Sequence, residues 1–153
     1  MIVLCDIDGT LANCDHRRKL LPSGKMDWKY FLNPDLVALD LPIVPVLNTV
    51  HALQADDNYV IFVTGRHEGL RSATHNWLIQ HFCMLEDDPP EILRMRKADD
   101  FRPDHIIKEE ILDSIILDMG GPPHLVIDDR PSVLSMWARR GIFTLSVPST
   151  FKE

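Results

Sequence analysis

Cysteines are few in this chain, and no apolar run is long. The three cysteines are scattered and odd in number, so they form neither the C-x-x-C pairs of a zinc site nor the even set of a disulfide framework. We interpret them as small, mostly buried thiols. The longest apolar stretch, residues 41–55, is too short and too polar to cross a bilayer, and the apolar start of the chain stops at Asp6 without the basic region of a signal peptide. These features predict a cytoplasmic protein without a membrane partner.

Basic residues are in the minority. The 16 Lys and Arg residues against 23 Asp and Glu residues give a net charge of -7, whereas a protein that grips many phosphates of a long duplex is normally basic. We therefore expect any nucleic-acid substrate to be met only at its end. One basic cluster stands out, and it is either solvated surface or a contact for a nucleic-acid backbone. It consists of Arg94, Arg96, Lys97 and Arg102.

The pattern of apolar residues predicts an α/β fold in one domain, residues 1–153, with three layers around a central parallel sheet. Apolar runs typical of buried strands alternate with segments of helical spacing, and this alternation is typical of βαβ units. No obligate protein partner is inferred from it. The expected strands are residues 2–5, 59–63, 125–127 and, more weakly, 142–147. The expected helices are 45–55, 70–82, 107–116 and 131–140, and the expected loops are a small insertion at about 13–35 and residues 84–104.

The segment Asp6-Ile7-Asp8-Gly9-Thr10 follows the first expected strand and carries two carboxylates two residues apart. An Asp has a reference pKa of about 3.9, so Asp6 is an anion at neutral pH and can attack phosphorus without losing a proton. We predict that Asp6 is the nucleophile and that an aspartyl-phosphate is the intermediate. Asp8 would act as the general acid and base, protonating the leaving oxygen and then activating water.

Two anions facing a phosphate require a hard cation, and Mg²⁺ prefers carboxylate, carbonyl and water oxygens. The predicted ligands are Asp6, the backbone carbonyl of Asp8, and Asp128, which follows the third expected strand. Asp129 would contribute directly or through a water, or would orient Lys108. Because ligands bind beyond the carboxyl ends of parallel strands, these residues should meet at one edge of the sheet.

Hydrogen-bond donors suited to phosphate oxygens follow the second expected strand. Thr64, Gly65 and Arg66 offer a hydroxyl, a backbone N–H and a guanidinium, and Thr10 offers a second hydroxyl. A lysine should hold both the nucleophile and the transferred phosphoryl group. We predict that it is Lys108, with Lys97 as the competing candidate.

These residues resemble the four ordered motifs of the haloacid dehalogenase superfamily: a D-x-D-G-T loop, a Thr or Ser, a Lys and an acidic pair. The segments T-G-R at 64–66, K-E-E-I at 108–111 and I-D-D-R at 127–130 are also similar to the 3′-phosphatase domain of bacteriophage polynucleotide kinase-phosphatase, over almost the whole chain. The resemblance implies a Rossmannoid fold with a minimal cap, Mg²⁺ as cofactor, and a phosphorylated nucleotide or nucleic-acid 3′ end as substrate.

Three alternatives stay open. The I-D-D-R-P segment is also similar to that of the 5′(3′)-deoxyribonucleotidases, which hydrolyse mononucleotides and usually carry a larger cap. A phospho-accepting domain resembling the response-regulator receivers uses similar residues, but its acidic pair precedes the phosphorylated Asp. A non-catalytic nucleotide-binding module would be indicated by the loss of a motif residue, and none is missing.

The aromatic residues have two interpretations. Trp28, Tyr30 and Phe31 either stack on a base from the insertion or fill a core. Trp77 and Trp137 fall among apolar neighbours on expected helices, and we interpret both as core.

Overall fold

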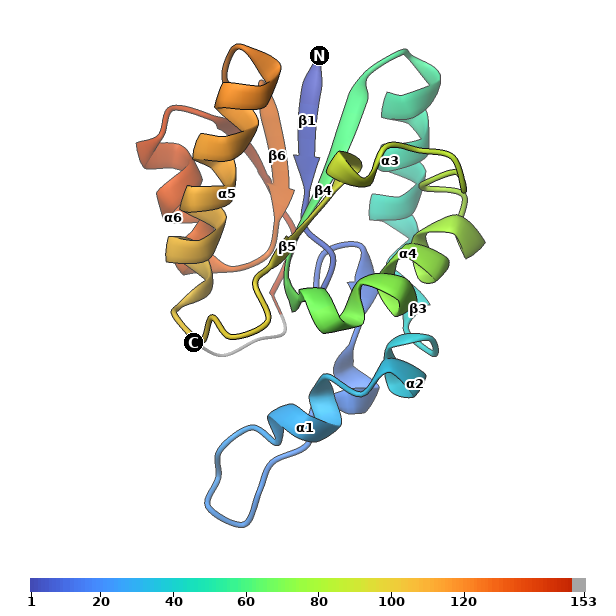
Figure 1. The fold of residues 1–153 in the computed structure, drawn as a ribbon, viewed down its shortest axis with the longest axis vertical. Helices are drawn as coiled ribbons and strands as arrows, with labels where there is room; N and C mark the ends of the chain where they lie inside the picture. The colour runs from blue at the N-terminus through green and yellow to red at the C-terminus, as the bar shows by residue number, and fades with distance from the viewer. Residues whose placement is uncertain (150–153) are drawn as a thin grey trace.

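The computed structural model describes residues 1–149 and is built on a five-stranded parallel sheet in the order β5-β4-β1-β6-β7 (Figure 1). This arrangement confirms the predicted α/β class with its central parallel sheet. The strands are β1 Ile2–Cys5, β4 Tyr59–His67, β5 Leu93–Arg96, β6 Leu125–Asp128 and β7 Phe143–Ser146.

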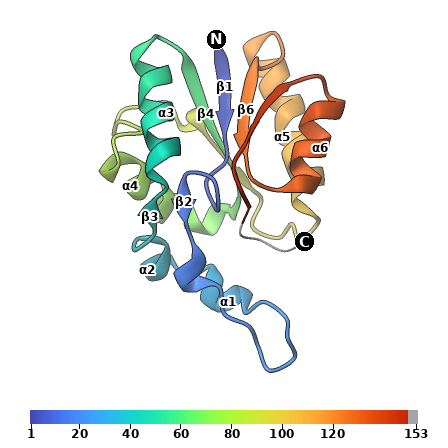
Figure 2. The ribbon, with the colours of Figure 1, turned by 180° about the vertical axis from the view of Figure 1, so that it is seen from behind.

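Helices cover both faces of the sheet and make three layers (Figures 1 and 2). Helices α3 (Val44–Ala55) and α4 (Arg71–Gln80) lie on one face, and α5 (Asp104–Met119) and α6 (Pro131–Arg139) lie on the other. Successive side chains of a strand point to opposite faces. Val3 therefore packs into the core under α3 and α4, and Leu4 into the core under α5 and α6. Two apolar cores fix the sheet between its helices.

All four expected helices and all four expected strands are present, with shifted ends. The segment predicted as a loop over residues 84–104 is the exception, because it holds the short helix Pro90–Ile92 and the edge strand β5. In β5, buried Leu93 and Met95 alternate with two half-buried arginines, which is the period-two pattern of a strand with one solvated face. Charge at every second position had concealed the strand.

The chain between β1 and α3 forms an arm beyond the carboxyl edge of the sheet, seen at the bottom of Figure 1. It contains two short strands, which pair antiparallel, and three short helices. These are β2 Ala12–Asn13, the 3-10 helix Asp15–Arg17, α1 Trp28–Phe31, α2 Pro34–Val37 and β3 Leu41–Pro42. The first and last strands of the arm therefore lie side by side.

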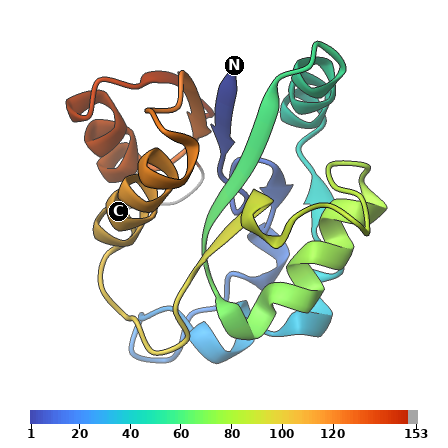
Figure 3. The ribbon, with the colours of Figure 1, turned by 45° about the horizontal axis from the view of Figure 1, so that its top comes forward.

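Among residues 1–149, none of the helices combines the length and apolar character that a bilayer span requires. A further 3-10 helix, Glu68–Leu70, joins β4 to α4 (Figure 3). The three cysteines are buried and free, as predicted.

Candidate active site

Three carboxylates and one lysine meet at the carboxyl ends of β1 and β6. Asp6 follows β1, Asp128 is the last residue of β6, and Asp129 is the next residue along the chain. Lys108 reaches them from α5, with its Nζ 2.7 Å from Asp6 Oδ1 and 2.8 Å from Asp128 Oδ2. All four residues are buried. Lys97, the alternative lysine, is exposed on the loop after β5.

The charges in this cluster are interdependent. Burial raises the pKa of Asp6 to about 7 even though Lys108 lowers it, and the neighbouring charges of Asp128 and Asp129 add to the increase. Burial also raises the pKa of Asp129. The pKa of Lys108 is raised, because the attraction of Asp128 and Asp6 outweighs the burial of its ammonium. The lysine is therefore charged, and the three carboxylates carry more negative charge than one lysine offsets.

The donor set suits a hard divalent cation. Asp6, Asp128 and Asp129 each offer an oxygen, and these atoms lie within 4.8 Å of one another. Oxygen ligands at this spacing are those that Mg²⁺ takes in proteins. The cluster can thus hold a metal ion, whose charge would relieve the repulsion among the three carboxylates.

The loop after β1 is shaped by Gly9. Its φ of 88° lies in the left-handed region, and a Cβ at this position would fall 2.5 Å from Asp129 Oδ2. A side chain would therefore push the two loops apart. The tight turn also aims the hydroxyl of Thr10 at the cluster, where its Oγ1 donates to Asp6 Oδ2 at 2.8 Å and lies 3.3 Å from Asp129 Oδ1.

Asp8 belongs to a second, separate ionic cluster. Its Oδ1 accepts from Nη2 of Arg66 at 2.6 Å and from Nη2 of Arg17 at 2.5 Å. Both guanidinium groups also bind Asp40 Oδ2, at 2.9 and 2.6 Å. Burial would raise the pKa of Asp8, but the charges of Arg66 and Arg17 outweigh it and lower the pKa to about 2. Asp8 is therefore held as an anion at the edge of the pocket.

The structure places the Thr64-Gly65-Arg66 segment inside the end of β4 rather than after the strand. The hydroxyl of Thr64 is buried and accepts from the backbone N–H of Arg66 at 3.2 Å. Arg66 is also buried, with its guanidinium on Asp8, Asp40 and Thr74 instead of facing open solvent. Of the three residues, Gly65 lines the pocket.

The basic cluster of the sequence is a set of ion pairs with an exposed lysine among them. Arg94 pairs with Asp118 at 2.9 Å, and Arg102 pairs with Asp100 and Glu110. Arg96 binds the carboxylate of Asp104, the carbonyl of Gly65 at 2.9 Å, and the carbonyls of Asp100 and Arg102. Because these arginines are occupied by contacts within the protein, a nucleic-acid backbone would be contacted mainly by exposed groups such as Lys97.

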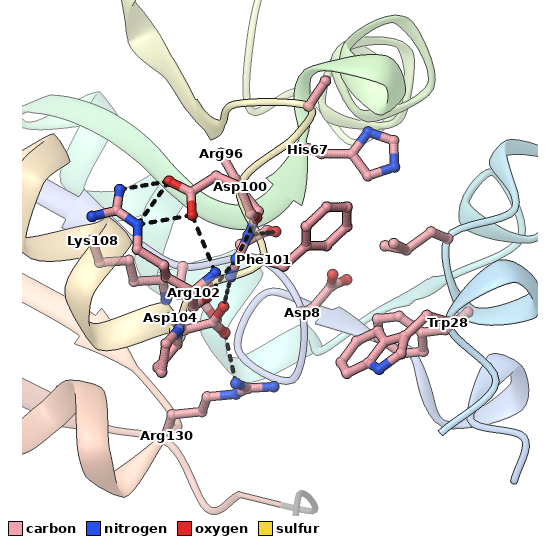
Figure 4. Close-up of a pocket in the computed structure, with 16 residues that line it drawn as sticks. Asp8, Trp28, His67, Arg96, Asp100, Phe101, Arg102, Asp104, Lys108 and Arg130 are labelled. Carbon is pink, nitrogen blue, oxygen red and sulfur yellow. Dashed lines mark hydrogen bonds and ion pairs between the residues drawn. The ribbon is translucent and has the colours of Figure 1, made fainter. Parts of the chain in front are cut away.

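A pocket of about 420 Å³ opens above Asp6 and Lys108 (Figure 4). One wall comes from the arm and the other from the loop between β5 and α5. The aromatic residues of the arm, which were expected either to stack on a base or to fill a core, differ in their exposure. Phe31 and Trp28 both line the pocket, but Phe31 is buried, with Arg17 over its ring at 4.4 Å, whereas Trp28 is exposed. Tyr30 does not line it, and its ring lies under Lys19. Trp77 and Trp137 are core, as predicted, and Trp137 Nε1 also lies 3.1 Å from Asp128 Oδ2.

Sequence reasoning missed four residues of this region: Arg17, Asp40, Phe101 and Asp104. Arg17 and Asp40 are buried in the arm and bind each other, and neither belongs to a recognisable sequence motif. Asp104 links two walls of the pocket, because it pairs with Arg96 and, at 2.7 Å, with Arg130. The position of Asp104 at the start of a helix after Pro103 was the one signal in the sequence that could have drawn attention to it.

Fold and site together define a phosphatase of the haloacid dehalogenase type, with its carboxylates and lysine at the carboxyl edge of a parallel sheet. More specifically, the model of the polynucleotide kinase PNKP phosphatase domain family matches residues 1–150. The chain belongs to this family, as the resemblance of its motifs predicted.

Individual relatives agree with this assignment. The chain is 30% identical over 152 residues to the "Putative bifunctional polynucleotide kinase/RNA ligase" of Autographa californica nuclear polyhedrosis virus, covering 97% of this chain and 19% of that protein. It is 27% identical, with a TM-score of 0.75, to a chain in the structure of the Pnkp1/Rnl/Hen1 RNA repair complex, covering 98% of this chain and 43% of that one. The chain therefore spans less than half the length of either relative.

A class C acid phosphatase from Bacillus anthracis shares the fold at a TM-score of 0.67. Its sequence identity to this chain is 12%, over 99% of this chain and 67% of that one.

Proposed function

We propose that this chain is a Mg²⁺-dependent phosphomonoesterase that removes 3′-phosphates from nucleic-acid ends through an aspartyl-phosphate on Asp6. The observation that carries the proposal is the buried Asp6 carboxylate at the floor of the pocket, bound by Lys108 and close to Asp128 and Asp129. Membership of the polynucleotide kinase PNKP phosphatase domain family supports the choice of substrate.

Mg²⁺ would be held by carboxylate oxygens of Asp6, Asp128 and Asp129, with the carbonyl of Asp8 as a further ligand. When bound, the ion supplies positive charge that lets an anionic phosphate approach these carboxylates. Support comes from the three converging oxygens and from the repulsion of Asp128 and Asp129, which adds to the effect of burial on the pKa of Asp6.

In the first step, an Asp6 carboxylate oxygen forms a bond to phosphorus while the ester bond to the 3′ oxygen breaks. Lys108 on Oδ1 and the hydroxyl of Thr10 on Oδ2 orient the carboxylate for this attack. Lys108 also lines the pocket, so its ammonium can stabilise charge on the transferred phosphoryl group. In the second step, water attacks phosphorus, the bond to Asp6 breaks and inorganic phosphate leaves.

Asp8 would exchange the two protons of the reaction, giving one to the leaving 3′ oxygen and taking one from water. With Arg66 and Arg17 on its carboxylate it is anionic, a state suited to the second step. Protonation for the first step requires weaker contact with these arginines. An incoming phosphate offers them a competing anion, so we propose that Arg66 shifts part of its hydrogen bonding to phosphate oxygens, aided by Thr64 and Gly65.

The test is phosphate release in Mg²⁺ from a panel of 3′-phosphorylated oligonucleotides, 5′-phosphorylated oligonucleotides, and 3′- and 5′-mononucleotides. We expect the highest kcat/KM on 3′-phosphorylated ends, with no measurable release by Asp6→Asn. Asp87→Asn, the same substitution on an exposed loop, is the matched control and should retain activity. A preference for mononucleotides would instead favour a nucleotidase, and a phosphorylated Asp6 that persists for minutes would favour a receiver-like domain.

A further inference from the structure

Two large aromatic rings stand exposed on opposite walls of the pocket. Trp28 belongs to α1 of the arm and is 55% exposed, and Phe101 belongs to the loop between β5 and α5 and is 90% exposed. Both line the pocket whose floor holds Asp6. In the view of Figure 4 the Asp8 carboxylate lies between the two rings. Two segments far apart in sequence thus present flat apolar faces to the space above the nucleophile.

The loop around Phe101 is held rigidly for an exposed segment. Arg96 Nη1 binds the carbonyl of Asp100 at 2.9 Å and that of Arg102 at 2.7 Å, which are the residues on either side of Phe101. The side chains of Arg102 and Asp100 also pair with each other at 2.6 Å. Fixed backbone on both sides keeps the ring on this wall of the pocket, and a preordered contact surface loses less entropy when a ligand binds.

Trp28 is also supported from behind. Its ring meets the edge of the buried Phe31 ring, with the two centroids 5.7 Å apart. Phe31 is in turn fixed by Arg17, whose guanidinium lies over the ring and donates to the Phe31 carbonyl at 2.7 Å. Trp28 is therefore connected, through Phe31 and Arg17, to the buried ionic cluster that holds Asp8.

The charge around the two rings differs from that of the whole chain. Residues 13–35 and 94–102 together hold nine of the 16 basic residues but five of the 23 acidic ones. An otherwise acidic protein is thus basic in the two segments that form the pocket walls. Aromatic faces among basic side chains are the combination that binds single-stranded nucleic acid, because bases stack and phosphates are neutralised.

We propose that Trp28 and Phe101 form a two-sided stacking platform for the terminal bases of a single-stranded 3′ end, which places its 3′-phosphate at Asp6. This inference rests on the proposed 3′-phosphatase function and specifies its substrate: a single strand that carries bases at its end. The ligand is recognised by its planar bases and its anionic backbone, with no need for one base sequence.

The first test compares 3′-phosphorylated oligonucleotides with a normal or an abasic terminal nucleotide. The wild type should have a lower KM for the normal end than for the abasic end. Trp28→Ala and Phe101→Ala should each raise the KM for the normal end by roughly tenfold. Each variant should therefore lose most of the preference. Trp28→Phe keeps a ring and should retain more of the preference for the normal end than Trp28→Ala does. Phe143→Ala, which removes an 80% exposed ring from β7 at the opposite ends of the strands, is the matched control and should leave the preference unchanged.

The second test uses tryptophan fluorescence and does not depend on turnover. Trp77 and Trp137 are buried, so quenching by a 3′-hydroxyl oligonucleotide reports on Trp28. The wild type should be quenched, and Trp28→Phe should not be.

The outcomes separate the platform from the function on which it rests. Equal KM and equal end preference in the wild type, Trp28→Ala and Phe101→Ala would overturn the platform while the 3′-phosphatase function stands. If the wild type releases no phosphate from either oligonucleotide but hydrolyses mononucleotides, the proposed function itself is wrong and the platform is overturned with it.

Discussion

The floor and the rim of the pocket are built in different ways. On the floor, Lys108 holds Asp6 and Asp128 with all three side chains almost fully buried. On the rim, Arg102 pairs with Asp100 and Glu110 in exposed contacts, and the rings of Trp28 and Phe101 face solvent. The floor is anchored to the central strands, whereas the rim consists of the exposed side chains of the arm and of the loop after an edge strand.

This difference indicates how tightly each region is constrained. A buried charge that loses its partner pays a large desolvation penalty, whereas an exposed ion pair contributes little. Single substitutions on the floor should therefore affect both stability and chemistry. Substitutions on the rim should alter which substrates bind and leave the fold intact, so the rim is where substrate choice can change.

The largest expected effect lies in the buried ionic cluster inside the arm. Arg17→Met leaves the buried Asp40 with less compensating charge, and we expect the free energy of unfolding to fall by about 3 to 5 kcal/mol. Arg94→Met, which breaks the partly exposed pair with Asp118, is the matched control and should cost less than about 1 kcal/mol. Urea unfolding followed by circular dichroism measures both. Equal losses in the two variants would contradict the distinction between buried and exposed ion pairs.

The next effect is on catalysis. Lys108→Met removes the ammonium that holds Asp6, and we expect kcat/KM on a 3′-phosphorylated oligonucleotide to fall by about two to three orders of magnitude. Lys97→Met, on the exposed loop, should keep activity within about twofold of the wild type, as expected of a substitution that touches no reacting group. The reverse ranking would assign the catalytic lysine to position 97.

Metal binding at the floor should stabilise the protein against unfolding. Mg²⁺ at about 100 times its dissociation constant should add about 2.7 kcal/mol to the free energy of unfolding. Asp128→Ala removes a proposed ligand, so its thermal midpoint should rise much less with Mg²⁺. Asp87→Asn should respond like the wild type. A Mg²⁺ response in Asp128→Ala as large as that of the wild type would place the ion elsewhere.

The smallest of these effects concerns pH. The pKa of Asp8 is lowered to about 2 in the folded protein, so the unfolded chain binds its proton first as the pH falls. The carboxylate should therefore contribute about 2 to 3 kcal/mol of stability above pH ~4, and this contribution should disappear as the pH falls towards ~2. Urea unfolding at pH 5 and pH 3 should show a larger loss for the wild type than for Asp8→Asn. Parallel losses would mean that the arginines do not perturb Asp8.

Much of the fold was readable from local patterns. The strands β1, β4 and β6 are apolar runs that end at polar clusters, and such runs indicate buried parallel strands whatever the rest of the chain does. The gathering of Asp6 and Asp128 also followed, because strand ends of a parallel sheet share one edge, whereas Lys108 was expected there from its place in the order of the motifs. The catalytic and metal-binding roles of these residues, and the single-domain organisation, stay predictions.

Other features were not readable because they depend on contacts between distant residues. The edge strand β5 was concealed by its two arginines, which tertiary contacts with Asp118 and Asp104 accommodate. The role of Arg66 in phosphate binding stays a prediction, but its ion pairs with Asp8 and Asp40 could not be read from the sequence. Nothing in the spacing of Arg17 and Asp40 indicates that they are partners, since the elements of the arm that join them are short and irregularly spaced.

The sequence by itself therefore determined the class of fold and the order of the chemical groups, because the period of apolar residues and the residues at strand ends are local properties. Only the tertiary structure decided which charges neutralise one another, that Trp28 is exposed while Phe31 is buried, and that Phe101 faces Trp28's wall of the pocket. The physical reason is that burial and electrostatic pairing depend on distances across the molecule, and these exist only once the chain has folded.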